Sequence, residues 1–419
     1  MENGTIRLPH ACALYIAAIL GSGVLFLSGS TADAAGPASL IAWAGVIALS
    51  FPLAYAFAAL SRMYPDAGGA ATFVKMAFGP KLGGLIGWCY FFCATAGQMI
   101  VSLTGAYYVS SSMGWGRTGM LLVALLTLVI AGTVNVQGVK ISGRLSLLLS
   151  SLLLALLLAV IVLTLPRLDI SRFAPFAPHG VASVGTAATM ILWSFFGWEA
   201  ICSLSHQFYK PERTIVRSTV ISAAVIGVLF LALSVVTIGT GTYGDDERNL
   251  SPVGIMMQES LGVGAQIGTG FLALIICLGT CNAFVASLGQ LGYALARDGV
   301  FPRLFVRLHP RKGTPVLAIA SVVMLAAVGV TFTVILSIPF DKLLLIPNSL
   351  GLTVYIISMA AGVKLFNRLT LPWWSSLLSL LLCLCLLPFF GRSLLAPAAM
   401  AAAYLLFVRS SRQRPSVRA

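Results

Sequence analysis

Apolar segments of about twenty residues recur along the whole chain, separated by short polar or Gly- and Pro-rich connections. A helix of that length crosses a hydrocarbon core of roughly 30 Å, because each residue adds about 1.5 Å of rise. The pattern therefore predicts an all-α integral membrane protein with twelve transmembrane helices, at residues 9–32, 38–60, 83–111, 119–136, 146–165, 182–207, 215–241, 264–294, 315–337, 343–363, 373–390 and 392–408.

Composition agrees with this pattern and excludes a soluble protein. Hydrophobic residues make up 58% of the chain and charged residues only 9%, with a mean hydropathy of +0.97. Such a chain has too little polar surface to coat a soluble globule. The longest polar connections, near 165–181 and 242–262, are too short for a soluble domain such as an ATPase. We expect one polytopic membrane domain over residues 1–419, with any energy supplied by gradients.

Basic residues alternate between the connections in a way that predicts topology. The net charge is +14, and 20 of the 26 lysines and arginines fall in connections on one side of the predicted spans. By the positive-inside rule, both termini are cytoplasmic and the number of spans is even. We expect residence in a bacterial inner membrane. The positive charge is a topology signal, so nucleic acid is excluded as a partner and the lipid bilayer is the expected surrounding.

Cysteine and histidine spacing gives no metal or cofactor site. All eight cysteines fall within predicted spans, where they suit the role of small buried apolar residues. Cys89 and Cys93 have i,i+4 spacing, as do Cys277 and Cys281, but the four histidines are too scattered to complete a metal site with either pair. The sequence predicts neither a metal nor a cofactor.

The first apolar segment carries Gly21-Ser22-Gly23 where a continuous helix would favour Ala or Leu. Unwinding is tolerated in a bilayer only where the backbone lines a cavity or is covered by protein, because every backbone group needs a partner. A half-helix that begins near Val24 would expose free N–H groups and the positive end of its dipole, which suits a carboxylate. The alternative is that these glycines only permit close helix packing.

A second glycine, Gly197, stands in the middle of the sixth predicted span, and Glu199 follows two residues later. Glu199 is the only acidic residue that the spans place deep in the bilayer, where a carboxyl group costs about 2.5–3.5 kcal/mol on insertion scales. Such residues usually mark a transport pathway or a proton relay. In the alternative, a protonated Glu199 donates a hydrogen bond to unwound backbone.

The interruptions fall in the first and sixth spans, an offset of five that is typical of an inverted five-helix repeat whose broken helices meet near the midplane. This arrangement predicts a 5+5 fold with discontinuous first and sixth helices and two further helices at the C-terminus. The repeats would cover 9–165 and 182–365, followed by helices over 366–409 and a basic cytoplasmic tail over 410–419. The helix would break in order to expose backbone to a small ligand.

At these positions the sequence resembles the amino acid–polyamine–organocation transporters, a family with the LeuT-like fold. The resemblance covers most of the first nine spans and is specific because its five motifs occur in the same order. They are "ILGSGVLF" (19–26), "AYAFAALSRMYPDAGGAATFVKMAFGPKLGGLIGW" (54–88), "GVKISGR" (138–144), "FFGWEA…KPER" (195–213) and "NAFVASLGQLGYALARDGVFPRLF…TP" (282–315). Within the family the chain is most similar to bacterial exporters of methionine and branched-chain amino acids.

The resemblance implies roles for residues around both glycine breaks, Gly21 and Gly197. Amides around Ser22, Gly23 and Val24 would hold the substrate carboxylate, and carbonyls of Ile19, Trp193 and Phe196 its ammonium group. Trp193, Trp198 and Phe284 would form gate or pocket walls, although ordinary core packing also explains these aromatic residues. Glu199 would be the proton-linked switch. Gln98 and Asn282 are polar candidates on the third and eighth spans, with an interhelical hydrogen bond as the alternative for each.

The chain departs from the family pattern in two places. Several sodium-independent relatives carry a lysine in the fifth span, but residues 145–163 contain none, so proton coupling through such a lysine is excluded. Ser150 or Ser151 alone makes a poor sodium site. After the sixth span the family often reads Glu-x-x-Asn-Pro, where this chain has Gln207-Phe208-Tyr209-Lys210-Pro211, which indicates a differently latched cytoplasmic gate.

These observations favour a secondary transporter of small neutral or apolar L-amino acids that works by alternating access. Methionine and branched-chain amino acids are the first substrates expected, followed by alanine-, serine- and cysteine-like ones, in proton-linked efflux or exchange by a monomer or homodimer. Uptake, or transport of another small amine, is the alternative. No catalytic motif lies at membrane depth, so an intramembrane enzyme is a remote alternative, and a channel lacks a visible selectivity filter.

Overall fold

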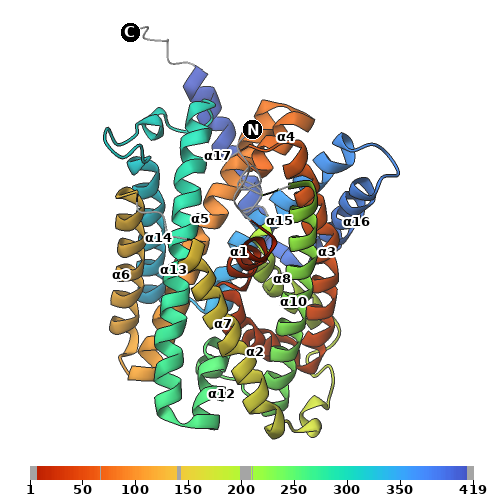
Figure 1. Cartoon of the computed structure of the whole chain (residues 1–419), viewed down its shortest axis with the longest axis vertical. Coiled ribbons are helices and arrows are strands. Elements are labelled where there is room, and N and C mark those ends of the chain that lie inside the picture. Colours follow the sequence, from red (N-terminus) through yellow and green to blue (C-terminus); the bar gives the residue numbers. More distant parts are fainter. Residues whose placement is uncertain (1–6, 67, 139–142, 199–208, 210, 413–419) are drawn as a thin grey trace.

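The computed structural model describes residues 7–412 apart from 67, 139–142, 199–208 and 210. Within these residues, nine helices are long and apolar enough to cross a membrane, and most run along the long axis of the molecule (Figure 1). The protein is therefore an all-helical, multi-pass membrane protein, as the hydrophobic pattern predicts. The full count of twelve spans stays a prediction.

The helices of the first half of the chain follow the predicted apolar segments, except for the short helix α4. They are α1 (Leu8–Leu20), α2 (Gly23–Ala35), α3 (Ser39–Met63), α4 (Ala70–Phe78), α5 (Pro80–Met113), α6 (Gly116–Val136) and α7 (Gly143–Thr164). Short 3₁₀ helices follow α2 and α7, namely η1 (Gly36–Ala38), η2 (Leu165–Arg167) and η3 (Ile170–Phe173).

The second half begins with the short helix α8 (Ala182–Ile191), which continues into η4 (Leu192–Phe195). Long apolar helices and short connecting helices then alternate up to the end of the described chain. These are α10 (Pro211–Thr240), α11 (Asp246–Leu250), α12 (Pro252–Leu261), α13 (Val263–Arg297), η6 (Arg303–Val306), α14 (Val316–Leu336), α15 (Phe340–Leu365), α16 (Leu371–Leu386), η7 (Leu387–Leu394) and α17 (Leu395–Arg412).

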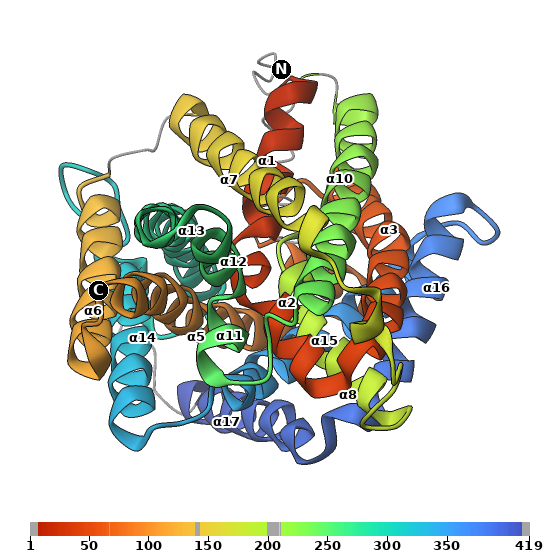
Figure 2. The ribbon, with the colours of Figure 1, turned by 90° about the horizontal axis from the view of Figure 1, so that it is seen from below.

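Helices from the two halves pack against each other in pairs. The most extensive contact joins α5 to α13, the two longest helices, with 34 and 35 residues. Helix α3 packs on α10, α6 on α14 and α2 on α8, while α1 lies between α7 and α10 (Figure 2). The short helices α1, α2 and α8 therefore lie among long helices that hold them on several sides.

Both glycine-containing segments interrupt helical geometry, as predicted. Helix α1 ends at Leu20, Gly21 adopts φ 9° and ψ −141°, and α2 begins at Gly23. Helical geometry after α8 ends at Phe195, because Phe196 is extended with φ −74° and ψ 121°. Gly197 follows with φ 152°, in the region where a residue without a Cβ is favoured. Glu199 lies outside the described residues.

Candidate functional site

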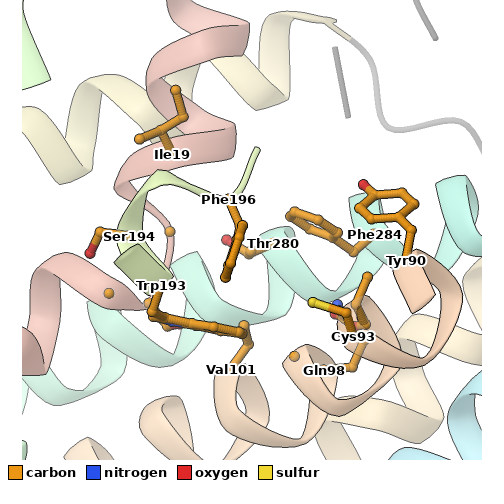
Figure 3. Close-up of a pocket in the computed structure, with 15 residues that line it drawn as sticks. Ile19, Tyr90, Cys93, Gln98, Val101, Trp193, Ser194, Phe196, Thr280 and Phe284 are labelled. Atoms are coloured by element: carbon orange, nitrogen blue, oxygen red, sulfur yellow. The ribbon is translucent and has the colours of Figure 1, made fainter. Parts of the chain in front are cut away.

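A cavity lies between the two helix breaks, and α5 and α13 close it from the side (Figure 3). Its volume, taken as the space open to the centre of a water molecule, is about 50 Å³. A single water needs about 10–15 Å³ by the same measure, so the cavity has room for a small molecule. Its lining includes eight residues singled out from the sequence: Ile19, Gly21, Ser22, Gly23, Gln98, Trp193, Phe196 and Phe284.

The start of α2 brings backbone donors to this cavity. Ser22 precedes the helix in αR geometry, is 2% exposed, and makes no side-chain capping bond. The first N–H groups of a helix have no acceptor within it, and the helix dipole adds partial positive charge at that end. Since Gly21, Ser22 and Gly23 all line the cavity, this helix end can hold a negatively charged group such as a carboxylate.

Gly23 brings the two breaks into direct contact. A Cβ built on Gly23 would overlap Ser194 Oγ and would lie 3.3 Å from both Cα and Cβ of Ser194. Gly97 on α5 has a similar role, because a Cβ there would lie 2.9 Å from Cη2 of the Trp193 ring. The backbone approaches its neighbours so closely at both positions that only glycine fits without a shift. These two glycines therefore allow the short distances from α2 and α5 to η4.

Aromatic side chains form one wall of the cavity. The rings of Trp193 and Phe196 meet edge to face, with centroids 6.3 Å apart. Phe196 also packs edge to face on Tyr355 of α15, at 5.2 Å between centroids. The Tyr355 hydroxyl donates to the Phe195 carbonyl at 2.8 Å. This bond fixes the backbone where η4 ends, because it provides a partner for a carbonyl that has left the helix.

Polar groups in the cavity are few and uncharged. Gln98 Nε2 donates to the Ala94 carbonyl at 2.9 Å, and Gln98 Oε1 is buried without a hydrogen-bond donor among the described residues. Ser194 Oγ is likewise buried without a described partner. None of the lining residues that the structure describes is Asp, Glu, Lys, Arg or His. The arrangement can hold a zwitterion on backbone dipoles while leaving no countercharge for an ionised side chain.

Four of the remaining predicted residues lie outside this lining. Val24 is 1% exposed and packs in the core, and Gly197 is not among the lining residues. Trp198 is also 1% exposed and packs on Tyr15, with ring centroids 5.6 Å apart. Asn282 forms an interhelical bond, since its Oδ1 accepts from Asn135 Nδ2 at 2.9 Å.

Seven lining residues were missed by the sequence reasoning: Tyr90, Cys93, Ala94, Gly97, Val101, Ser194 and Thr280. Five of them share the face of α5 that carries Gln98, because they recur at helical spacing along that helix. Thr280 lies one turn before Phe284 on α13 in the same way. Extending one helical face from Gln98 and from Phe284 would have found six of the seven.

Comparison with known proteins agrees with this geometry. A family model described as amino acid permease matches residues 6–410, which is nearly the whole chain. The chain belongs to the amino acid permease family. It is therefore a transporter of amino acids across a membrane and not an enzyme.

Relatives of this permease cover most of its length. It is 34% identical over 398 residues to the uncharacterized amino acid permease YecA of Bacillus subtilis, covering 95% of this chain and 94% of the relative. It is 29% identical over 369 residues to the L-methionine/branched-chain amino acid exporter YjeH of Escherichia coli, covering 86% of each. The crystal structure of MhsT in complex with L-phenylalanine shares the fold, with a TM-score of 0.66 at 17% identity over 96% of this chain and 100% of that one.

Proposed function

We propose that this permease moves small neutral amino acids with apolar side chains, methionine and the branched-chain amino acids first, by alternating access. The observation that carries the proposal is the cavity between two helix breaks, which offers backbone dipoles and aromatic walls but no ionisable lining side chain among the described residues. A cationic or anionic substrate side chain would lose its hydration there without gaining a countercharge. The printed name of the relative YjeH supports the same substrate class.

In the proposed pose, the substrate carboxylate lies at the start of α2, on amides of Ser22, Gly23 and Val24. The ammonium group donates to carbonyls of Ile19, Trp193 and Phe196, which lie next to the two breaks. The Trp193 carbonyl also accepts from the Phe196 N–H at 3.3 Å and would use its second lone pair. Gln98 Oε1 provides one more acceptor within the cavity. The apolar side chain then lies against three aromatic or aliphatic lining residues, Trp193, Phe284 and Val101.

We further propose twelve spans in a 5+5 arrangement, with repeats over 9–165 and 182–365 and two added helices over 366–409. Two of the nine long apolar stretches, Gly23–Met63 and Leu371–Ser410, have 41 and 40 residues. Leu371–Ser410 holds α16 and α17 and suits two crossings, because 40 residues of helix span about 60 Å, twice the thickness of a hydrocarbon core. Gly23–Met63 joins α2, the second half of the broken first span, to α3, the second span. Pairing of α3 with α10, α5 with α13 and α6 with α14 is what an inverted repeat would produce.

The direction of transport follows from the gradients that act on a common site. We propose proton-linked efflux or exchange in a bacterial inner membrane, with both termini cytoplasmic and Glu199 as the proton-linked group, in a monomer or homodimer. Uptake uses the same site and is the alternative. The charge distribution supports the orientation, since 20 of 26 basic residues fall on one side of the predicted spans.

Counterflow in proteoliposomes tests the proposal. Vesicles are loaded with unlabelled amino acids, and each radiolabelled amino acid is supplied outside, at two pH values and without sodium. Accumulation of methionine or leucine, but not of lysine or glutamate, is expected. The Glu199→Gln variant should transport without pH dependence. Accumulation of lysine at the rate of methionine would contradict the substrate class, and unchanged pH dependence in the variant would contradict the role of Glu199.

A further inference from the structure

A second cavity lies where the end of α3 meets the turn between α15 and α16. By the same measure, its volume is about 360 Å³, compared with about 50 Å³ for the cavity between the helix breaks. In Figure 1 this turn lies at the upper end of the bundle, the end that also carries α4. The lining includes Arg62 and Met63 from α3 together with Phe366, Asn367 and Thr370 from the turn.

The cavity offers positive charge that the described residues do not neutralise. Arg62 is exposed, and no carboxylate in the described part of the chain lies within ion-pairing distance of its guanidinium group. The acid next along the chain, Asp66, accepts from the Gly68 N–H at 2.8 Å and from the Thr72 hydroxyl at 2.9 Å. Arg368, also exposed, belongs to the turn itself, and Lys364 stands in the last turn of α15, where its ammonium group lies 5.0 Å from the centre of the Phe78 ring. The site therefore favours an anion.

Large apolar side chains are exposed at this site and at chain positions next to it. Met63 lines the cavity and is 50% exposed. Leu371 and Trp374, at the start of α16, are 64% and 51% exposed. In a membrane protein, tryptophan is enriched at the level of the lipid headgroups, and exposed aliphatic side chains of a span contact acyl chains. An anion in this cavity thus borders on a surface that hydrocarbon covers.

We propose that this cavity binds the headgroup of an anionic phospholipid. Arg62 contacts the phosphate, and the Asn367 carboxamide, which bonds to no other described side chain or backbone group, donates a further hydrogen bond. The acyl chains lie along Met63 and Leu371. A free phosphate ion shares the charge of a lipid phosphate but leaves the apolar border uncovered, so the lipid satisfies both parts of the site.

Native mass spectrometry of the purified full-length chain in detergent tests this proposal. Dioleoylphosphatidylglycerol and dioleoylphosphatidylcholine are titrated separately, and the bound lipids are counted. The wild type should retain phosphatidylglycerol in preference to phosphatidylcholine. Arg62→Gln should weaken phosphatidylglycerol binding roughly fivefold, the effect of one basic residue near a charged membrane surface. Arg62→Lys should retain most of the binding, because the charge remains.

Arg307→Gln provides the matched control, because Arg307 is an exposed arginine outside the cavity and on the same predicted side. Equal loss in Arg62→Gln and Arg307→Gln would overturn the proposal in favour of diffuse surface charge. Binding of inorganic phosphate with the same dependence on Arg62, and no preference between the two lipids, would overturn the lipid assignment. Asn367→Ala gives an independent test if Arg62→Gln fails to fold, and it should also reduce the preference for phosphatidylglycerol.

Discussion

The contact between Gly23 and Ser194 makes a quantitative prediction about transport. In Gly23→Ala, the new methyl group overlaps Ser194 Oγ and lies 3.3 Å from Ser194 Cα and Cβ. The hydroxyl can rotate away about one bond, but the backbone carbon cannot. The start of α2 and the end of η4 must therefore separate by a few tenths of an ångström. Both segments line the cavity, so the separation changes the site itself.

Overpacking by one methylene costs about 1–3 kcal/mol, and rotation of the hydroxyl places this case near 1 kcal/mol. That energy lowers the population of states with the two breaks in contact about fivefold. We expect the initial rate of methionine counterflow in Gly23→Ala to fall by about that factor. Gly23→Leu brings three more carbons into the same contact and should abolish transport without preventing insertion.

The double variant Gly23→Ala/Ser194→Gly tests the cause of this loss. Ser194→Gly removes Oγ and Cβ, two of the three atoms that the methyl group meets, so the double variant should recover most of the rate. Gly45→Ala on α3 is the control, because nothing lies within 4 Å of its added Cβ. Rates are compared at equal membrane abundance. Wild-type transport by Gly23→Ala, or no recovery in the double variant, would refute the reasoning.

Two further predictions concern the polar and thiol groups of the bundle. Asn282→Ala breaks the bond from Asn135 Nδ2 and should lower stability by about 1 kcal/mol, seen as a lower unfolding temperature in detergent, with unchanged apparent affinity for methionine. Reduced affinity at an unchanged unfolding temperature would make Asn282 a substrate ligand instead. Cys93 lines the cavity, so methionine should slow its alkylation by N-ethylmaleimide, whereas lysine, which the cavity does not bind, should leave the rate unchanged. Equal alkylation rates with methionine and with lysine would contradict the assigned cavity.

Hydropathy predicts the long helices well because almost every residue of a span is either buried in the protein or in contact with lipid. The segment 83–111 corresponds to α5 (Pro80–Met113), and 119–136 to α6 (Gly116–Val136). Short helices outside the spans carry no such signal. Helix α4 (Ala70–Phe78) buries Phe73 and Val74 against the bundle, but nine residues between glycines give no twenty-residue apolar pattern.

The candidate cavity could be predicted only in part, for a related reason. Glycine breaks in apolar segments are visible in the sequence, and they lead to Ser22, Gly23 and Trp193. Cys93 and Val101 are ordinary apolar residues in an apolar helix, so only packing against α13 and the breaks decides that their face is inward. The partner of Asn282 likewise depends on the register between two helices, which one chain's sequence does not give.

The cavity draws on two kinds of protein group, and they differ in how they respond to mutation. Amides and carbonyls at the helix breaks are backbone, so a substitution changes their position but never their chemistry. The face of α5 contributes Cys93, Gln98 and Val101 as side chains, each of which a single codon change can replace. In the proposed pose, the carboxylate and ammonium groups that all amino acids share contact backbone groups. The side chain, which differs among amino acids, contacts protein side chains that mutation can replace. Substrate preference can then diverge among related permeases while the two helix breaks keep the same backbone groups.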